Sequence, residues 1–395
     1  MLNLSEREQQ SYFQVYKRYP LEVDYAKGCR VYTTDGKVYL DFLAGIAVNA
    51  LGHSHPKVVE AVCTQAQKYM HISNYLYQEP QVKIAEKLKE MSGLGRVFLT
   101  NSGTEATEGA IKLARKYGID KGKTEIIAFS GGFHGRTYGA LSLMDKPQYK
   151  DGMGPYLSGM KVIKYNDIIE LENNVNDATA AVILEFIQGE GGISQASNEF
   201  ANKIVSLREK FGFLLIADEI QAGSGRTGKF LAYQNYNIQA DIVTLAKGMG
   251  GGMPLGAILA DEKLANVWSK GMHGTTYGGN AVACASGLVV LDELQNGVME
   301  NVNNIGNYFI EKLHEIKSKH SDKVIEVRGS GLLLGLLLNF EAAELVQVML
   351  KHNVISNAAS GSVLRIVPPL IIGKAEVDEF IDALDKSLKE IENRL

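Results

Sequence analysis

Short apolar runs that alternate with helical patterns constrain the fold of this chain more than any other feature. The runs are rich in Val, Ile, Leu and Ala on both faces, and ~10 to 30 residues, often including a helix, separate them. Strands that are apolar on both faces occur mainly in parallel sheets with helices on either side. The sequence therefore predicts an α/β fold whose main, mostly parallel sheet uses RVFLT (96–100), EIIAFS (125–130), AAVILE (180–185), FLLIADE (213–219), DIVTLA (241–246) and LGAILA (255–260).

Two further segments predict a second, smaller α+β domain built from both ends of the chain. Near the N-terminus, CRVYTTDGKVYLDF (29–42) alternates around Asp35-Gly36, which is a good hairpin signal. Beyond residue 280, long amphipathic patterns surround KVIEVRGSGLLLGLLL (323–338). We expect residues 1–50 to contribute to the small domain, 51–275 to form the large domain and 276–395 to complete the small one.

The composition argues against several functional classes. A formal net charge of −4 gives no basic surface of the kind that nucleic-acid-binding proteins carry, so small anionic metabolites are the simpler partners. No segment reaches the ~18 uninterrupted apolar residues of a membrane span, and the polar N-terminus lacks the apolar core of a secretion signal. Three cysteines without C-x-x-C spacing indicate neither disulfides nor zinc, and His53 and His55 lack a third metal ligand nearby. We expect a cytoplasmic protein that binds no metal, membrane or nucleic acid.

Polar or glycine-rich clusters follow five of the apolar runs, where ligands bind in sheets of this kind. After RVFLT, Ser102, Gly103 and Thr104 precede a helical pattern whose first turn would offer free N–H groups to a phosphate. The S-x-x-E spacing of Ser102 and Glu105 is equally consistent with a plain capping box. These residues alone leave both interpretations open.

Asp218 and Lys247 pose opposite problems at the ends of two other runs. An unpaired carboxylate at the mouth of a buried strand is costly, so Asp218 requires a partner, which for an isolated Asp is most simply a loop N–H group or an Arg. Desolvation at the end of DIVTLA would lower the pKa of Lys247 toward the neutral amine that attacks carbonyls. Taken singly, Lys247 is better explained as a side chain whose ammonium reaches water. The glycines at 248 and 250–252 would leave room for a planar ligand.

A glycine-rich stretch, GSGRTGK (223–229), also matches nucleotide-binding patterns. The dinucleotide pattern G-x-G-x-x-G requires its glycines directly after a strand, whereas Asp218 to Ala222 intervene here. The P-loop pattern requires Ser or Thr after the lysine, where this chain has Phe230. A nucleotide-binding enzyme is therefore the weaker alternative.

Taken together, the strand-end clusters resemble those of a known enzyme family. Asp-x-x-Gln after one strand, Lys after the next, the Ser-Gly-Thr turn, FHGRT (133–137) and GEGG (189–192) are similar in order and spacing to the class III aminotransferases, which use pyridoxal 5′-phosphate. The resemblance runs from YLDFLAGIAVNALGHSHP (39–56) to LRIVPPL (364–370), and within the class it is strongest to the acetylornithine aminotransferases. It implies the fold of the fold type I pyridoxal-phosphate-dependent transferases.

The resemblance also implies a role for each cluster around the cofactor. Lys247 would bind the cofactor covalently and later move a proton, and Asp218 would keep the pyridine nitrogen protonated. The other implied cofactor-binding residues are Ser102, Gly103 and Thr104 for the phosphate, Phe133 for stacking on the ring, Gln221 near the 3′ oxygen and Glu185 beside them.

A further implied residue points to a homodimer with shared active sites. In the family, a threonine of the partner subunit also binds the phosphate, and Thr276 in HGTTYGGN (273–280) is the match. The remaining implied positions bind substrate, and they are Arg136 and Arg365 for the two carboxylates of a dicarboxylate, Glu190 as a movable counter-ion of Arg365, Tyr77 (with Tyr75 as the alternative) in the pocket, and Gly45 where an acyl group needs space.

These implied roles predict transfer of the terminal amine of an Nα-acylated ornithine to 2-oxoglutarate, a step of arginine biosynthesis. N-acetylornithine is favoured as the donor and N-succinylornithine is the alternative acylated one. Ornithine, 4-aminobutyrate and an acylated lysine are rival donors in the same fold, and a non-catalytic protein would lack Lys247. Two departures from the family pattern affect local shape: Phe186 replaces a proline in EFIQGEGG, and SNYLYQEP (73–80) is rearranged.

Overall fold

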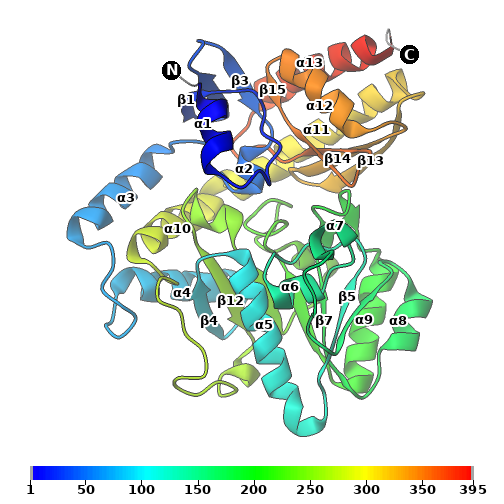
Figure 1. The fold of residues 1–395 in the computed structure, drawn as a ribbon. Helices are drawn as coiled ribbons and strands as arrows, with labels where there is room; N and C mark the ends of the chain where they lie inside the picture. Colours follow the sequence, from blue (N-terminus) through cyan, green and yellow to red (C-terminus); the bar gives the residue numbers. More distant parts are fainter. Residues whose placement is uncertain (1–2, 393–395) are drawn as a thin grey trace.

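A computed structural model describes residues 3–392 of the chain. A seven-stranded sheet forms the core of its larger part, and two four-stranded sheets with long helices lie at one end of it (Figure 1). The order of strands across the large sheet is β4 (Arg96–Thr100), β12 (Gly256–Ala260), β11 (Ile242–Leu245), β10 (Leu214–Asp218), β7 (Thr179–Leu184), β5 (Glu125–Phe129) and β6 (Met160–Ile163).

All six predicted apolar runs are strands of this sheet, and the mostly parallel arrangement is confirmed. From β11 to β6 every neighbouring pair is parallel, whereas β12 is antiparallel to both β11 and β4. Antiparallel β12 follows from the short connection after β11, because a parallel neighbour would require a longer crossover. Strand β6, a half-buried edge strand, is not among the predicted runs.

Both faces of the sheet are buried, which explains why its strands are apolar throughout. Ile126 and Ala128 pack in one apolar cluster with α5 (Gly103–Gly118), while Ile127 and Phe129 pack in another with α9 (Asn198–Phe211). Successive side chains of a strand point to opposite faces of the sheet. Because helices cover both faces, apolar residues are needed at every position of the strand.

The other helices cover the sheets and connect them. None of the helices within residues 3–392 is long and apolar enough to cross a membrane. The remaining helices are α1 (Leu4–Ser11), α2 (Ala44–Ala47), α3 (Pro56–Lys68), α4 (Glu79–Ser92), α6 (Tyr138–Ser142), α7 (Pro147–Lys150), α8 (Ile168–Asn174), α10 (Ala281–Glu293), α11 (Met299–Lys319), α12 (Ala342–Lys351) and α13 (Lys374–Glu392), with shorter turns η1 (Ile119–Lys121), η2 (Ala232–Tyr236), η3 (Lys247–Gly250), η4 (Glu262–Leu264) and η5 (Leu294–Val298).

The two ends of the chain share one of the smaller sheets. The predicted hairpin is present as β2 (Arg30–Thr33) and β3 (Val38–Asp41), with β1 (Val23–Lys27) on one side and the C-terminal β15 (Val354–Ile355) paired in parallel on the other. A second sheet contains β13 (Val324–Ser330), β14 (Leu333–Leu338), β17 (Val363–Ile366) and β16 (Asn357–Ala359). Helix α10 packs mainly on α3 and α4, so chain segments on both sides of residue 275 pack together. The domain boundaries at residues 50 and 275 stay predictions.

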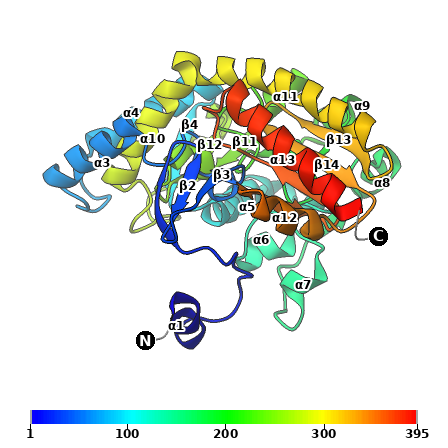
Figure 2. The same cartoon turned by 90° about the horizontal axis from the view of Figure 1, so that it is seen from above.

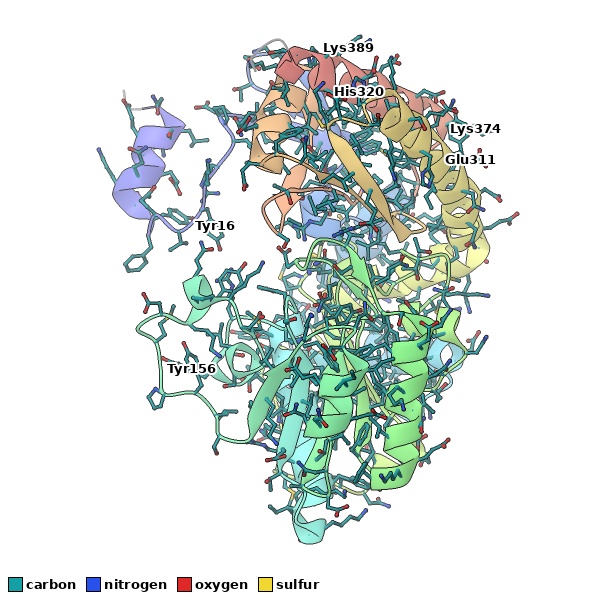
Figure 3. All side chains as sticks on the ribbon, turned by 90° about the vertical axis from the view of Figure 1, so that its right-hand side faces the viewer. Tyr16, Tyr156, Glu311, His320, Lys374 and Lys389 are labelled. Atoms are coloured by element: carbon teal, nitrogen blue, oxygen red, sulfur yellow. The ribbon has the colours of Figure 1, made fainter. Side chains whose placement is uncertain are left out.

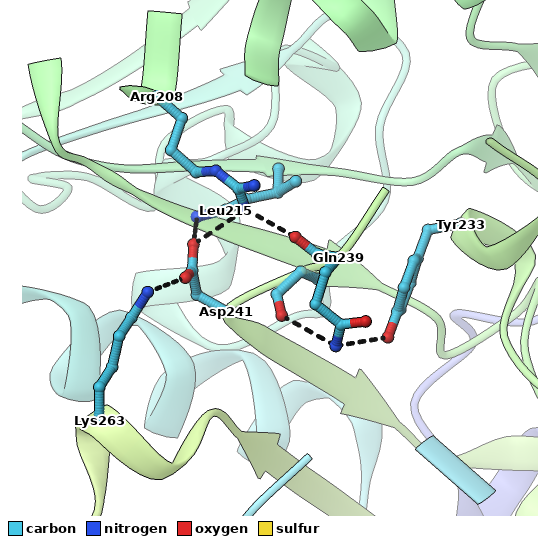
Figure 4. A network of polar contacts seen from close by, with 7 residues as sticks. Arg208, Leu215, Tyr233, Gln239, Asp241 and Lys263 are labelled. Carbon is cyan, nitrogen blue, oxygen red and sulfur yellow. Dashed lines mark hydrogen bonds and ion pairs between the residues drawn. The ribbon is translucent and has the colours of Figure 1, made fainter. Parts of the chain in front are cut away.

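A polar network fixes the edge of the large sheet where β11 begins. The Asp241 carboxylate accepts a hydrogen bond from the Leu215 backbone N–H at 2.7 Å and forms ion pairs with Arg208 and Lys263 (Figure 4). These charges lie at the start of the strand, whereas Lys247 follows its end. The network therefore stabilises the sheet where β11 begins, at the opposite end of this strand from the strand-end clusters.

Candidate active site

The carboxyl ends of β4, β5 and β11 border a cavity of about 420 Å³. Its lining includes the predicted cofactor-binding residues Ser102, Gly103, Thr104, Phe133 and Lys247, together with Arg136, which is predicted to bind a substrate carboxylate. These residues come from three connections that are far apart in sequence, and the parallel strands bring them to one edge. The cavity thus lies where the strand-end rule predicts a ligand.

The turn after β4 places the N-terminus of a 16-residue helix at the cavity. Ser102 is the N-cap of α5, and its Oγ accepts a hydrogen bond from Glu105 N at 3.3 Å. Glu105 does not return the bond to Ser102 as in a capping box, but accepts from Asn101 N at 2.7 Å. Gly103 is required because a Cβ there would lie 2.9 Å from two atoms of the Ile220 side chain. The free N–H groups of this first turn favour an anion.

Asp218 ends β10 and is fully buried, and its partner is a histidine rather than an arginine. Its Oδ2 lies 2.6 Å from His134 Nδ1, and its Oδ1 accepts hydrogen bonds from Thr244 Oγ1 at 3.2 Å and Ile220 N at 3.1 Å. Burial lowers the pKa of His134, but the hydrogen bond to Asp218 and its charge outweigh that effect and leave the pKa above its usual value. The histidine therefore fixes the orientation of the carboxylate and compensates its charge.

Lys247 follows β11 directly and lines the cavity with a backbone φ of 45°. A left-handed conformation is strained for a lysine, and such strain is concentrated at functional sites. Its ammonium forms no ion pair or hydrogen bond with the residues that the structure describes. Burial lowers the pKa of Lys247, Arg365 lowers it further, and the carboxylates of Glu185, Glu190 and Asp218 act in the opposite direction. The side chain is thus biased toward the neutral, nucleophilic amine.

A second buried carboxylate, Glu185, contacts the loop that lines the same cavity. Its Oε1 accepts a hydrogen bond from Phe133 N at 2.8 Å, and its Oε2 accepts one from Gly189 N at 3.2 Å. Burial and the charge of Asp218 raise the pKa of Glu185, against the lowering effects of His134 and the two N–H groups. Glu185 therefore holds Phe133 in place through its backbone.

Arg365 enters the site from β17 of a smaller sheet, and its Nε and Nη1 atoms contact protein acceptors. Its guanidinium forms an ion pair with Glu190, donates to Gln221 Oε1 at 3.0 Å and to Asn357 Oδ1 at 3.1 Å, and is 1% exposed. Glu190 lies in the glycine-rich turn between β8 (Ile187–Gln188) and β9 (Ser194–Gln195). Burial raises the pKa of Glu190, but the charge of Arg365 and its hydrogen bond lower it to below its usual value. The Glu190 carboxylate is therefore ionised at neutral pH.

Arg136 differs from Arg365 because its guanidinium has no hydrogen-bonding partner among the described residues. Among the described residues it forms no ion pair or hydrogen bond, and its Cζ lies over the ring of Tyr149 on α7, 3.7 Å from the centroid. The Tyr149 ring also meets Phe133 edge to face, with 6.0 Å between the centroids. The N–H donors of Arg136 are therefore free for an external carboxylate.

The lining of this cavity does not include Thr276, Tyr75, Tyr77 or Gly45. Thr276 is exposed at a separate recess of about 990 Å³ that loop 271–278 forms with α4 and β4. Tyr75 and Tyr77 are 98% and 102% exposed. Gly45, with a φ of 63°, lies in α2, which packs against η3, the turn that begins at Lys247. Within one chain, Gly45 therefore lies near the site, whereas Thr276, Tyr75 and Tyr77 lie apart from it.

Phe186 and the GSGRTGK stretch have structural explanations. Phe186 is buried against Tyr236, with ring centroids 5.0 Å apart, so it is part of the apolar core. No helix begins at the third glycine of 223–228, which dinucleotide binding would require. Arg226 of this stretch is buried instead, and its guanidinium donates to Leu332 O and Pro368 O.

A comparison with known families identifies this arrangement. The profile of the aminotransferase class-III family matches residues 12–388. The chain is a class III aminotransferase. The predicted family and its fold type I architecture are thereby confirmed.

Individual relatives of this aminotransferase agree with the family. The acetylornithine aminotransferase of Methanocaldococcus jannaschii is 45% identical, over 98% of each chain. The solved N-acetylornithine aminotransferase of Stenotrophomonas maltophilia is 33% identical with a TM-score of 0.85, over 99% of this chain and 100% of that one. The ornithine aminotransferase of Toxoplasma gondii is 30% identical with a TM-score of 0.94, over 98% and 94%, and holds pyridoxal phosphate at partial occupancy in its active site.

The family implies pyridoxal phosphate, and the residues of this aminotransferase fit it. The cavity has a helix N-terminus for a phosphate, and Lys247 lines it as an amine without a protein partner. Asp218, buried just below, supplies a carboxylate for a ring nitrogen. These are the groups that this cofactor requires.

Two residues of the aminotransferase site, His134 and Tyr149, are not among the predicted ones. His134 was quoted within FHGRT without a role, because neither its burial nor its contact with Asp218 is visible in the sequence. Tyr149 follows a proline in a polar stretch, and no spacing links it to Arg136. An aromatic residue near a predicted carboxylate-binding arginine was the only available signal.

Proposed function

We propose that this aminotransferase transfers the terminal amine of an Nα-acylated ornithine to 2-oxoglutarate, as a cytoplasmic step of arginine biosynthesis. N-acetylornithine is the favoured donor, as the names of its relatives suggest, and N-succinylornithine is the alternative. The observation that carries this proposal is the difference between the two arginines: Arg136 has no hydrogen-bonding partner among the described residues, while Glu190 neutralises Arg365.

That difference between the two arginines suits one substrate with a single carboxylate and another with two. An acylated ornithine presents a terminal amine with no carboxylate beside it, so only Arg136 is needed for the carboxylate at its other end. 2-Oxoglutarate and glutamate carry two carboxylates, and the second requires Arg365. Glu190 would have to leave Arg365 in that half of the reaction, and its glycine-rich turn permits movement.

The cofactor-binding residues have separate tasks in this proposal. Pyridoxal phosphate, when bound, supplies an electron sink for the carbon that loses its proton. Lys247 holds the cofactor through its amine and moves the proton. Asp218 holds the ring nitrogen, with His134 fixing its orientation. The other contacts are Ser102, Gly103 and Thr104 to the phosphate, Phe133 on the ring face, Gln221 near the 3′ oxygen and Glu185 as the support of Phe133.

A second copy of the chain completes the proposed site. Thr276 lies in its own recess, apart from the cavity that Ser102 and Thr104 line, which is consistent with service to a neighbouring subunit. Tyr75 and Tyr77 project fully from the surface and would be covered in such a dimer. We propose that Tyr77 borders the substrate in the assembled site and that Gly45, beside η3, leaves space for the acyl group.

A panel of amine donors tests the proposal. Initial rates would be measured with N-acetylornithine, N-succinylornithine, ornithine, 4-aminobutyrate and an Nα-acylated lysine, each with 2-oxoglutarate. We expect an acylated ornithine to give the highest kcat/KM and Lys247→Ala to abolish transfer with every donor. Negligible turnover of both acylated ornithines would reject the proposed substrate while leaving the family unchanged. An NAD- or ATP-dependent reaction that survives Lys247→Ala would instead favour the glycine-rich stretch at 223–229.

A further inference from the structure

Lys146 is a half-buried cation beside the site, and the proposed reaction gives it no task. It begins the short segment of α7, immediately before Pro147, and its Nζ donates to the Glu190 backbone O at 3.4 Å. Its ammonium is 5.5 Å from the centroid of the Tyr149 ring, the ring on which Arg136 stacks. Within residues 3–392 it forms no ion pair with a carboxylate. A half-buried ammonium without a counter-ion is costly and requires an explanation.

Three positively charged residues act on the Glu190 carboxylate, and they differ in whether they can pair with it during the reaction. Arg365 is its partner in this structure, and Lys247 and Lys146 also act on its carboxylate. In the proposed reaction with a dicarboxylate, Glu190 has to release Arg365. Lys247 is then linked to the cofactor or occupied with proton transfer, so it offers no lasting countercharge. Of these three cations, Lys146 is the one that remains.

We propose that Lys146 binds the Glu190 carboxylate when Glu190 releases Arg365, and so stabilises the form of the enzyme that accepts dicarboxylates. This inference rests on the proposed function, in which Arg365 binds the second carboxylate. Lys146 already contacts the backbone of residue 190, so a rotation of the Glu190 side chain and a small shift of its glycine-rich turn bring the two charges together. Lys146 is a positioning residue: it acts on the substrate only through Glu190.

The two half-reactions of the holoenzyme separate this role from a general one. Each is followed by stopped-flow absorbance of the cofactor, with the amine donor alone or with 2-oxoglutarate after the amine has been loaded. We expect Lys146→Gln to lower the second-order rate constant for 2-oxoglutarate roughly tenfold, a change equivalent to about 1.4 kcal/mol. The amine half-reaction should stay within about twofold, because Glu190 remains on Arg365 there. Lys146→Arg should restore the wild-type rate.

Lys150 provides a matched control in the same segment. Its Nζ donates to Met144 O at 2.9 Å and lies 4.5 Å from the Tyr156 ring centroid. Like Lys146 it is half-buried, bonded to a backbone carbonyl and close to a tyrosine ring, but its Nζ does not bond to residue 190. Lys150→Gln should leave both half-reactions unchanged. An equal loss in Lys150→Gln, or an equal loss in both half-reactions of Lys146→Gln, would mean that the lysine merely anchors the loop and would overturn the proposal.

Binding of glutarate, a dicarboxylate that cannot react, gives a readout independent of turnover. Its dissociation constant, from a spectral titration of the holoenzyme, should rise roughly tenfold in Lys146→Gln and not at all when Glu190→Ala is already present. A persistent loss in the Glu190→Ala background would show that Lys146 contacts the ligand itself, and the proposal would fail. If Arg365→Lys leaves glutarate binding intact, the proposed function fails instead, since Arg365 would not be the dicarboxylate site.

Discussion

The aromatic ring beneath Arg136 determines how that guanidinium is presented. Tyr149 contacts Arg136 on one side and Phe133 on another, so one side chain links the proposed carboxylate-binding residue to the proposed cofactor-stacking residue. Stacking on a ring fixes the plane of a guanidinium without using its N–H donors. The donors remain available for a bidentate contact.

Replacement of Tyr149 tests this arrangement at the level of a single residue. We expect Tyr149→Leu to raise KM for the amine donor roughly fivefold to tenfold, because a cation–π contact of about 1 kcal/mol is lost, with a smaller effect on kcat. Tyr149→Phe should behave like the wild type, since it keeps the ring. The measurement is steady-state kinetics with N-acetylornithine at saturating 2-oxoglutarate. Equal losses in Leu and Phe variants would contradict a role for the ring.

Glu219, next to Asp218, predicts how stability depends on pH. Burial raises the pKa of Glu219 to about 8, although the N–H groups of Ala232 and Tyr233 donate to it at 2.7 and 2.9 Å and act in the opposite direction. A pKa above the unfolded value means that the folded state holds the proton more tightly. The stabilisation is complete below about pH 4 and is lost as the pH rises through 8.

Glu219→Gln removes this titration. We expect the wild type to lose up to ~1.4 kcal/mol of unfolding free energy per pH unit, relative to the variant, between about pH 5 and 8. The variant should show a flatter profile over that range. Thermal unfolding of both holoenzymes at several pH values would check this expectation through the difference in Tm. Parallel profiles would mean that Glu219 does not titrate in this range.

At the scale of elements, burial on both faces made the positions of the strands predictable from the sequence. It did not predict whether neighbouring strands run parallel or antiparallel. DIVTLA and LGAILA both matched strands, but an apolar strand has the same composition whether it runs parallel or antiparallel to its neighbour. The turn after Ser102 could be predicted because a cap is local. The contact between His134 and Asp218 joins residues 84 positions apart, and only the packed sheet creates it.

Gly103 tests the fit between the start of α5 and the loop after β10. A Cβ at residue 103 would lie 2.9 Å from two atoms of Ile220, so Gly103→Ala should displace the helix N-terminus or the loop. We expect at least a tenfold rise in the dissociation constant of pyridoxal phosphate, measured by titration of the apoenzyme. Ile220→Ala should restore binding when combined with Gly103→Ala, and on its own should have a smaller effect. Failure of the double variant to recover would contradict a steric cause.

At the scale of the whole molecule, several aromatic side chains are exposed on one side of the single chain. Helix α1 stands apart from the body, and the segment after it exposes Phe13 at 91% (Figure 2). Tyr16 of this segment and Tyr156 of the loop after α7 project on the same side of the molecule (Figure 3). Burial of such groups is favourable, which supports the proposed dimer.

Mixed dimers would reveal whether Thr276 serves the neighbouring subunit. Lys247→Ala inactivates its own site but keeps Thr276, whereas Thr276→Val keeps Lys247. If Thr276 acts across the dimer, co-refolding the two weak variants in equal amounts should restore about a quarter of the wild-type activity, because half of the dimers gain one complete site. Lys247→Ala mixed with the Lys247→Ala, Thr276→Val double variant is the control and should stay inactive. If the first mixture gained no activity, Thr276 would not contribute to the active site of the partner subunit.

Arg365 reaches the site from β17, whereas Asp218 ends β10 of the large sheet and Lys247 begins η3, with one residue between it and β11. The reactive groups and the arginine proposed for the second carboxylate are thereby encoded in different parts of the chain. For protein engineering, a library restricted to the neighbours of Arg365 on β16 and β17 should change the accepted dicarboxylate while the reactive centre stays unchanged. For evolution, the same separation means that a duplicated gene can acquire a new amine acceptor through substitutions around Arg365 while Asp218 and Lys247 are retained.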